Sequence, residues 1–405
     1  MPLWRLSSTK TLAAAAMRTV SFLILPVLFL RADPGEQGPA LEREGEYWVE
    51  RFGGTVPAAE APFLRIETRG NVIFQGDGGS SLGYQIIRRV QARSEAEARR
   101  MLQWAGTPKP VRTGDQIELS ARLGSKVTTD IRVQPPRQLR QVVVETETGQ
   151  VEVRDVRAPV NIGNGGGPIL CDRIWGSLSI RSGGGDLVLG NINGPVRVAT
   201  ASGMIRLRQA GGEATLETGG GEITVDEVLG PLFAVTGAGS IDVGRAGGRV
   251  EAHARGGLVR VREAGGEVVA ESGGGGILVG SAKGVRCESA AGAVKLAGVS
   301  GQIQVRTIVG SIIAELATAR PLVNSLLSAA RGDITVWIPA DLPITVAAIA
   351  DSPRSRIVSE FREIPVGSLA LDGELRCIAR GSLNGGGPVL KVAAGDGVVY
   401  LRRQR

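Results

Sequence analysis

The stretch TGGGEITVDEVLGPLFAVTGAGSIDV, residues 218–243, decides the fold of this 405-residue chain. Gly221, Gly230 and Gly239 stand nine residues apart, and two residues after each glycine an apolar–x–apolar triplet begins. Alternation of apolar and other residues is the pattern of a β-strand that buries one face. The stretch therefore predicts short strands separated by glycine corners.

The nine-residue spacing extends far beyond this stretch. Glycine occupies fourteen successive positions at this spacing from Gly167 to Gly284 and, after one slip, the series resumes at Gly292. The apolar triplets keep the same phase over residues 142–312. Such a fixed period is typical of repeat proteins, in which each unit packs on its neighbours.

Two nine-residue units are needed to enclose a core, because one strand and one corner cannot close a coil. The sequence supports this doubling, since glycine-rich corners such as 219–221 alternate with leaner ones such as 229–231, and Ala214 and Ala234 occupy inward positions of alternate strands. We predict an all-β fold, a parallel β-solenoid (β-helix) with 18-residue coils, preceded by a small α/β N-terminal cap. Coils about 4.8 Å apart would form a rod of roughly 48 Å over residues 142–312.

The first 32 residues have the pattern of a secretory signal peptide. Three basic residues precede an apolar run over residues 20–30, and Ala32 is a small residue at the expected cleavage point. The run is short for a membrane span, and an uncleaved anchor is the alternative. We expect an exported protein that is periplasmic, in the cell envelope or extracellular, with no membrane span in the mature chain unless the signal stays uncleaved.

The remaining chain divides by composition and regularity. Ser94 and Glu97 predict the capping box of one helix, in a section rich in aromatic residues that we expect to cover the open edge of the first coil. The predicted parts are a signal peptide at 1–32, a linker at 33–59, an N-terminal α/β cap section at 60–141, a regular β-solenoid at 142–319, and irregular C-terminal solenoid coils with a cap at 320–405.

Glycine-rich corners can also serve phosphate or calcium binding, and the pattern argues against both. A phosphate loop leads into a helix, whereas each corner here leads into another strand. Calcium-binding nonapeptide arrays need an acidic ligand at one place in every repeat, but successive repeats place Asp186, Pro195 and Met204 there. We expect no cofactor and no metal array, and leave a single adventitious calcium site open.

Catalytic groups are sparse. His253 is the one histidine and falls at the end of a predicted strand, so no Ser-His-Asp or Cys-His arrangement can be nominated. Polysaccharide-cleaving β-helix enzymes build their grooves from long loops, and residues 142–312 contain no insertion longer than the nine-residue step. We predict a non-enzymatic protein, with an envelope polysaccharide-processing enzyme on the same fold as the alternative.

Three cysteines and three aromatic residues stand out against the repeat. Cys171, Cys287 and Cys377 occupy inward-type positions, which predicts three free, buried thiols. The candidate binding-surface residues are Phe233, which faces outward from a strand, Trp175, which lies beside a corner glycine, and Trp337.

The partners that the sequence favours are an envelope polysaccharide or a surface protein. Self-association through the solenoid ends is a further possibility. The formal charge of +7 becomes +3 without the four basic residues of 1–32, and the other basic residues are scattered. We therefore expect no nucleic-acid partner.

Several segments together resemble a known bacterial family. They are SEAEARRML at 94–102, VETETGQVEV at 144–153, ARGDITVWIPADLPITV at 330–346 and LNGGGPVLKVAAGDGVVYLRR at 383–403. They are similar to the exported β-strand-repeat family known as "putative adhesin", or toastrack, over about residues 60–405. The resemblance implies a cell-envelope β-solenoid of unknown biochemical role and supplies no site residues. With the repeat, it favours an exported scaffold or adhesin-like binding protein.

Overall fold

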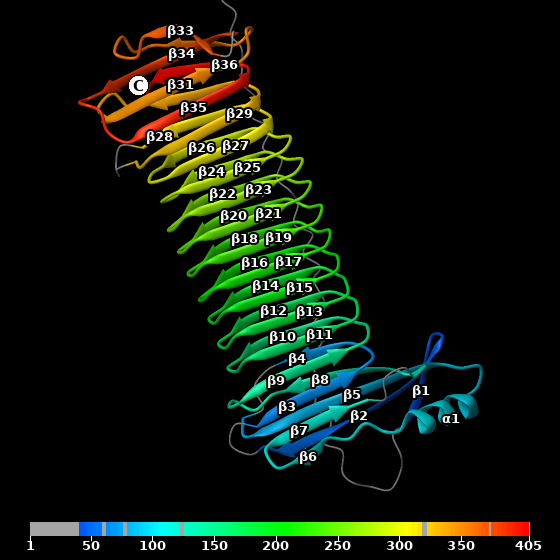
Figure 1. Cartoon of the computed structure of the whole chain (residues 1–405). Helices are drawn as coiled ribbons and strands as arrows, with labels where there is room; N and C mark the ends of the chain where they lie inside the picture. The colour runs from blue at the N-terminus through cyan, green and yellow to red at the C-terminus, as the bar shows by residue number, and fades with distance from the viewer. Residues whose placement is uncertain are drawn as a thin grey trace, which may run out of the picture.

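A computed structural model describes residues 40–58, 62–75, 79–121, 125–317, 322–371 and 374–404. The chain forms a long stack of coils, with the N-terminal section at one end and the C-terminal strands at the other (Figure 1). The predicted parallel β-solenoid is confirmed, because each strand of the stack pairs in parallel with the strand one coil further along. The predicted signal peptide at 1–32 lies outside the described residues.

Two sheets form the walls of the rod, and each coil contributes one strand to each sheet. In sheet A, Val225 pairs with Val243, and Val243 pairs with Val261, so the register advances by 18 residues per coil. The rod strands of sheet A are β10 (Val151–Val156), β12 (Ile169–Ile174), β14 (Leu187–Ile192), β16 (Ile205–Ala210), β18 (Ile223–Val228), β20 (Ile241–Ala246), β22 (Val259–Ala264), β24 (Ile277–Ser281), β26 (Val294–Val299), β28 (Ile312–Leu316) and β30 (Ile334–Ile338).

The strands of sheet B alternate with these along the chain. They are β9 (Gln141–Thr146), β11 (Val160–Asn164), β13 (Leu178–Ser182), β15 (Val196–Thr200), β17 (Ala214–Thr218), β19 (Leu232–Thr236), β21 (Val250–Ala254), β23 (Val268–Ser272), β25 (Val285–Ser289), β27 (Ile303–Val309) and β29 (Ser325–Arg331). The slip in the glycine series is a coil one residue shorter, where Val268 pairs with Val285.

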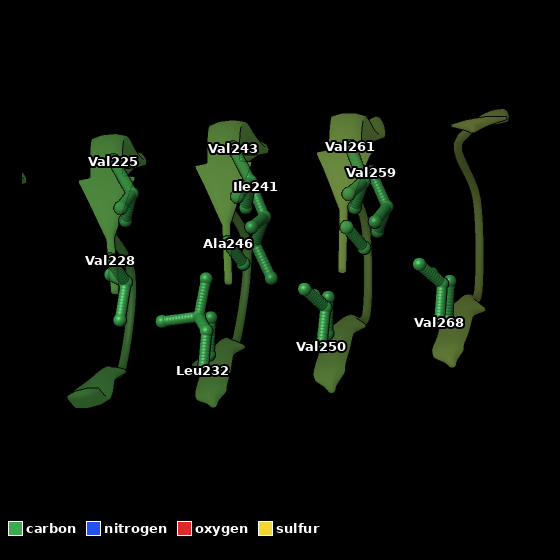
Figure 2. Close-up of a cluster of buried hydrophobic side chains, with 14 of the residues drawn as sticks. Val225, Val228, Leu232, Ile241, Val243, Ala246, Val250, Val259, Val261 and Val268 are labelled. Carbon is green, nitrogen blue, oxygen red and sulfur yellow. The ribbon is translucent and has the colours of Figure 1, made fainter. Parts of the chain in front are cut away.

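The core consists of aliphatic columns that run along the rod. Figure 2 shows equivalent residues of successive coils side by side, in order along the rod from left to right. All members are buried, and alanine fills several places in sheet B, as the sequence predicts. The columns in view are Val225, Val243 and Val261; Val228 and Ala246; and Leu232, Val250 and Val268.

Each sheet B strand of a regular coil ends in a buried residue that, in most coils, is a threonine or serine. The Thr218 hydroxyl donates a hydrogen bond to the carbonyl oxygen of Gly203 at 3.0 Å and accepts one from the Gly221 N–H at 3.2 Å. Thr236 and Ser272 make the same pair of contacts one and three coils further on. These side chains satisfy part-buried backbone groups of the corners, which would otherwise lack this partner.

The glycines of these corners are required by the stacking itself. A Cβ atom on Gly221 would overlap the carbonyl oxygen of Gly203 in the preceding coil. Gly203 has a φ of +109°, in the region that glycine adopts without steric cost. The glycine spacing therefore reflects close contact between successive corners.

The N-terminal section extends both sheets beyond the rod. It comprises β1 (Leu41–Glu44), β2 (Tyr47–Pro57), β3 (Phe63–Thr68), β4 (Val72–Phe74), β5 (Ser81–Gln91), α1 (Glu95–Ala105), β6 (Val111–Thr113), β7 (Gln116–Ser120) and β8 (Thr128–Gln134). The predicted linker at 33–59 is wrong for residues 41–57. Antiparallel pairing along the whole of β2 with β5 makes this segment part of sheet A.

The predicted helix is present as α1 and packs on the N-terminal part of sheet A. Ser94 caps it, accepting a hydrogen bond from the Glu97 N–H at 3.2 Å. Arg88, on β5, is 2% exposed and pairs with Glu50 of β2 at 3.0 Å, and its guanidinium also contacts the Leu102 carbonyl oxygen of α1. Burial lowers the pKa of Arg88, and the Glu50 carboxylate opposes this shift.

The C-terminal strands are β31 (Ile344–Ala350), β32 (Arg356–Ser359), β33 (Val366–Leu371), β34 (Glu374–Leu383), β35 (Val389–Asp396) and β36 (Val398–Arg403). The last coil, β35–β36, lies between the coils β29–β30 and β31–β32 and pairs in parallel with both. The coil β3–β4 is placed in the same way, between β7–β8 and β9–β10. At each end, a coil near the chain terminus is therefore held inside the stack.

Candidate binding surfaces

A shallow groove runs along the edge of the rod where sheet B strands turn toward sheet A. Two hollows, of about 610 and 790 Å³, both reach Val235, and together we call them the corner groove. Small corner residues such as Gly183, Ala201 and Ala290 leave this edge concave. Charged and apolar side chains of the strand ends line it: Arg181, Glu217, Val235, His253, Arg255, Glu271, Glu288, Arg306 and Ile308.

His253 occupies the middle of the corner groove and is held from two sides. Its Nδ1 lies 3.0 Å from Oε2 of Glu271 on the next coil, and its Nε2 lies 3.1 Å from Oε1 of Glu251 on its own strand. Both ring nitrogens therefore have carboxylate partners. The sequence predicted a lone surface or corner histidine, and the 18-residue separation of His253 and Glu271 was the available signal for one of the two contacts.

Phe233, a predicted binding residue, lies on β19 next to this histidine. It is half-buried between inward-facing Leu232 and Ala234, and its ring centroid is 6.0 Å from that of His253. Its strand also supplies Val235 to the groove. Phe233 therefore borders the corner groove, but its ring is partly covered by the imidazole.

Trp175 lies at the opposite edge of the rod, where sheet A strands turn toward sheet B. It borders a hollow of about 520 Å³ between this edge and the segment after β8, which we call the Trp175 hollow. The Arg157 guanidinium carbon lies 5.3 Å from the centre of the indole ring. The hollow is lined by Pro135, Pro136, Arg137, Leu139, Asp155, Val156, Arg157 and Trp175.

An ion pair between successive coils supports this hollow. Arg173 donates hydrogen bonds from Nε to Oδ1 of Asp155 at 2.6 Å and from Nη2 to Oδ2 at 2.8 Å. These bonds from Arg173 lower the pKa of the Asp155 carboxyl, a shift that desolvation opposes. Asp155 and Arg173 have φ values of +60° and +52°.

Trp337 is separate from both surfaces. It is half-buried on β30, in register with Glu315 on one side and Arg402 on the other. The structure therefore does not bring Phe233, Trp175 and Trp337 together. Composition and repeat phase could place each residue on the surface. The distances between the residues depend on the number of coils that separate them and on the edge or face of the rod on which each one lies.

The cysteines follow the prediction in part. All three are free; Cys171 and Cys287 are fully buried, and burial raises the pKa of both thiols. Cys377 was predicted to be buried, and this is wrong: it is half-buried, because β34 lies in the terminal β31–β34–β33 part of sheet B rather than in a closed coil.

Within the described ranges, no group of three or more histidine, cysteine or acidic residues is placed to hold a metal ion. Over the same ranges, no helix combines the length and apolar character needed to cross a membrane.

Comparison with known proteins adds two solved structures. No protein-family model and no curated protein matches the sequence. A "putative cell adhesion protein" from Clostridium sporogenes is 10% identical, over 88% of this chain and 100% of that chain, with a TM-score of 0.19. A "putative adhesin" from Bacteroides fragilis is 13% identical, over 64% of this chain and 97% of that chain, with a TM-score of 0.30. Both descriptions are of the adhesin type that the sequence segments resemble, and at these TM-scores the architecture rests on the strand pairing described above.

Proposed function

We propose that this chain is an exported, non-enzymatic scaffold of the cell envelope or cell surface that binds a polysaccharide along its corner groove. The observation that carries the proposal is the groove itself, which follows the rod axis across many coils. Export rests on the sequence pattern of residues 1–32. An intact mass that begins at Asp33 would agree with a cleaved signal, and a mass that includes residues 1–32 would contradict cleavage.

The groove suits a linear polymer better than a compact ligand. Its lining repeats at the coil spacing of about 4.8 Å, so equivalent side-chain positions recur at regular intervals along the groove. Arginine and glutamate side chains line most of the groove, and Val235 and Ile308 add apolar surface. Because the backbone is fixed by pairing on both sides, little ordering is needed when a ligand binds.

Envelope polysaccharide processing is the second candidate function. His253 with Glu251 and Glu271 favours it, since carboxylates and imidazole are the usual general acids and bases. Both imidazole nitrogens, however, already lie 3.0 and 3.1 Å from carboxylate oxygens. This arrangement fits a side chain fixed in place between two coils, so we favour binding without turnover.

One experiment separates the two functions. Purified protein is mixed with isolated bacterial envelope polysaccharide, and the pellet and the released reducing ends are both measured. We expect co-sedimentation without new reducing ends. Release of reducing ends that stops in Glu271→Gln would establish the enzyme instead, and absence of both co-sedimentation and reducing ends would contradict both functions.

A matched pair of variants locates the binding face. Val235→Arg places a long charged side chain in the corner groove, whereas Val188→Arg makes the same change on the outer face of sheet A. We expect Val235→Arg to weaken binding at least about tenfold and Val188→Arg to leave it unchanged. Equal effects of the two variants would rule out the groove as the binding face.

Self-association through the rod ends is a separate part of the proposal. At the N-terminal end, β1 is the outermost strand of sheet A and carries three charged residues, which oppose edge pairing. At the other end, β33 is the outermost strand of sheet B, and its Val366 and Leu369 are exposed. If copies join by this end, the sedimentation coefficient rises with concentration, and Leu369→Lys reduces the rise; a constant coefficient would contradict it.

A further inference from the structure

We propose that the Trp175 hollow binds a carboxylate-bearing sugar unit of an anionic polysaccharide. This site lies at the edge of the rod opposite the corner groove. It is therefore a second site, and its existence does not depend on the proposed groove.

The hollow exists because the repeat is interrupted beside it. Along the regular rod, sheet A strands lead to sheet B strands through three-residue corners, such as residues 175–177 between β12 and β13. Residues 135–140, between β8 and β9, are a longer connection that contains Pro135 and Pro136. Proline fixes φ and gives this wall a rigid course. The resulting hollow of about 520 Å³ falls within the size range of small-ligand sites, about 300–1,000 Å³.

The indole of Trp175 provides the apolar surface of the site. Trp175 is 44% exposed, so a ligand in the hollow can reach it. The flat face of an aromatic ring can pack against the apolar side of a ligand whose other side is polar. A pyranose ring has one apolar and one polar side of this kind. Arg157 lies over the indole, where cation–π attraction restricts the guanidinium to one region.

The charge of the hollow favours an anion. The Asp155 carboxylate accepts two hydrogen bonds from Arg173, which also pairs at 2.6 Å with Asp172, a residue outside the lining. Arg137 and Arg157 are the remaining charged residues of the lining, and within the described part of the chain Arg157 makes no ion pair. A guanidinium can donate two hydrogen bonds to the two oxygens of a carboxylate. The indole of Trp175 would therefore contact the sugar ring, and the guanidinium of Arg157 would bind its carboxylate.

Backbone geometry also distinguishes these coils. Asp155 and Arg173 lie 18 residues apart, at equivalent places in successive coils, and both have left-handed φ values. Among the described residues, only Asn384 is another non-glycine residue with a positive φ. Such conformations are unfavourable for residues other than glycine and are retained where the surroundings hold them. The left-handed residues Asp155 and Arg173 directly precede Val156–Arg157 and Ile174–Trp175. They therefore determine the backbone direction of the two corners that line the hollow.

The test uses trigalacturonate as the acidic probe and galactotriose as its uncharged counterpart, with titration calorimetry and tryptophan fluorescence. We expect the full chain to bind trigalacturonate and to bind galactotriose at least about tenfold more weakly. Trp175→Ala and Arg157→Gln should each reduce the affinity for trigalacturonate at least about tenfold. Added salt should weaken binding, because the contact is charge-assisted.

Matched controls separate this site from general surface effects and from the groove. Trp104→Ala removes another exposed tryptophan, on α1, and Arg197→Gln removes an exposed arginine on β15; both should bind like the unchanged protein. Val235→Arg should also retain binding, because it alters only the corner groove. Unchanged circular dichroism in each variant shows that the coils are intact. Equal binding of the two sugars, full binding by Trp175→Ala, or no binding of trigalacturonate would each overturn the proposal.

Discussion

The Thr236 hydroxyl donates a 2.7 Å hydrogen bond to the carbonyl oxygen of Gly221, which lies fifteen residues earlier in the preceding coil. The Thr236 hydroxyl oxygen also accepts a hydrogen bond from the Gly239 N–H at 3.1 Å. One buried side chain thus joins two successive glycine corners. This contact explains why the residue that ends each sheet B strand is so often a threonine or serine.

Replacing Thr236 by valine should destabilise the rod. Valine has nearly the same shape but leaves the Gly239 N–H of this part-buried corner without its partner, and the loss of such a hydrogen bond costs about 1 kcal/mol. Urea unfolding followed by circular dichroism measures the change. Thr215→Val, on the outer face of β17, is the matched control and should change stability by less than about 0.5 kcal/mol. Equal stability of the two variants would contradict the role of the buried hydroxyl.

Two neighbouring glycines should respond differently to alanine. In Gly221→Ala the new Cβ would overlap the Gly203 carbonyl oxygen, whereas a Cβ on Gly220 meets no atom within 4 Å. We expect Gly221→Ala to lower the free energy of unfolding by about 2 kcal/mol or more, or to abolish soluble expression. Gly220→Ala should remain close to the unchanged protein. The midpoints of thermal and urea unfolding distinguish the two, and a tolerated Gly221→Ala would show that the corners can move apart.

Much of the fold could be predicted because the repeat is periodic. The inward residues Ile223, Val225 and Leu232 recur at fixed spacing, and that spacing determines strand, corner and coil length together. The strands at 41–57 could not be found in this way, because they pair antiparallel with β5 and carry no nine-residue pattern. The position of β35–β36 inside the stack was also hidden, since pairing between distant segments leaves no local signal.

The candidate surfaces were harder to predict than the rod. Trp175 was recognisable beside a corner glycine, but its hollow depends on the course of residues 135–140. The partner of Asp155 could have been suspected, because Arg173 follows it by one 18-residue coil, the separation that places side chains next to each other. His253 follows the same rule with Glu271. Reading charged residues at coil spacing would have found both pairs.

The cysteines should differ in their reaction with thiol reagents. Burial raises the pKa of Cys171 and Cys287, so the reactive thiolate is scarce and inaccessible in the folded protein. We expect iodoacetamide to leave both unmodified in the native state, to reach Cys377 first, and to modify all three in urea. Mass mapping of the labelled peptides measures this. Native labelling of Cys171, or a disulfide found under non-reducing conditions, would contradict the coil register.

The Asp155–Arg173 pair should make a small, pH-dependent contribution to stability. The hydrogen bonds from Arg173 hold the pKa of Asp155 below its ordinary value of 3.8. A carboxyl with a lowered pKa in the folded state stabilises the protein above its unfolded-state pKa, and this contribution is lost as the pH falls through the folded-state pKa. Because both side chains are nearly half exposed, solvent screening keeps this contribution small.

Asp155→Asn tests this contribution, because asparagine also tolerates a positive φ and the substitution removes mainly the charge. We expect the variant to be less stable than the unchanged protein at pH 7, and the difference to shrink as the pH falls below about 4. Urea unfolding at several pH values measures it, and added salt should reduce the difference at pH 7. Glu213→Gln, at an exposed corner, should show no such pH-dependent difference. If Asp155→Asn differs from the unchanged protein equally at pH 7 and at pH 3, the ion pair is not the source of the effect, and the left-handed backbone at this corner is.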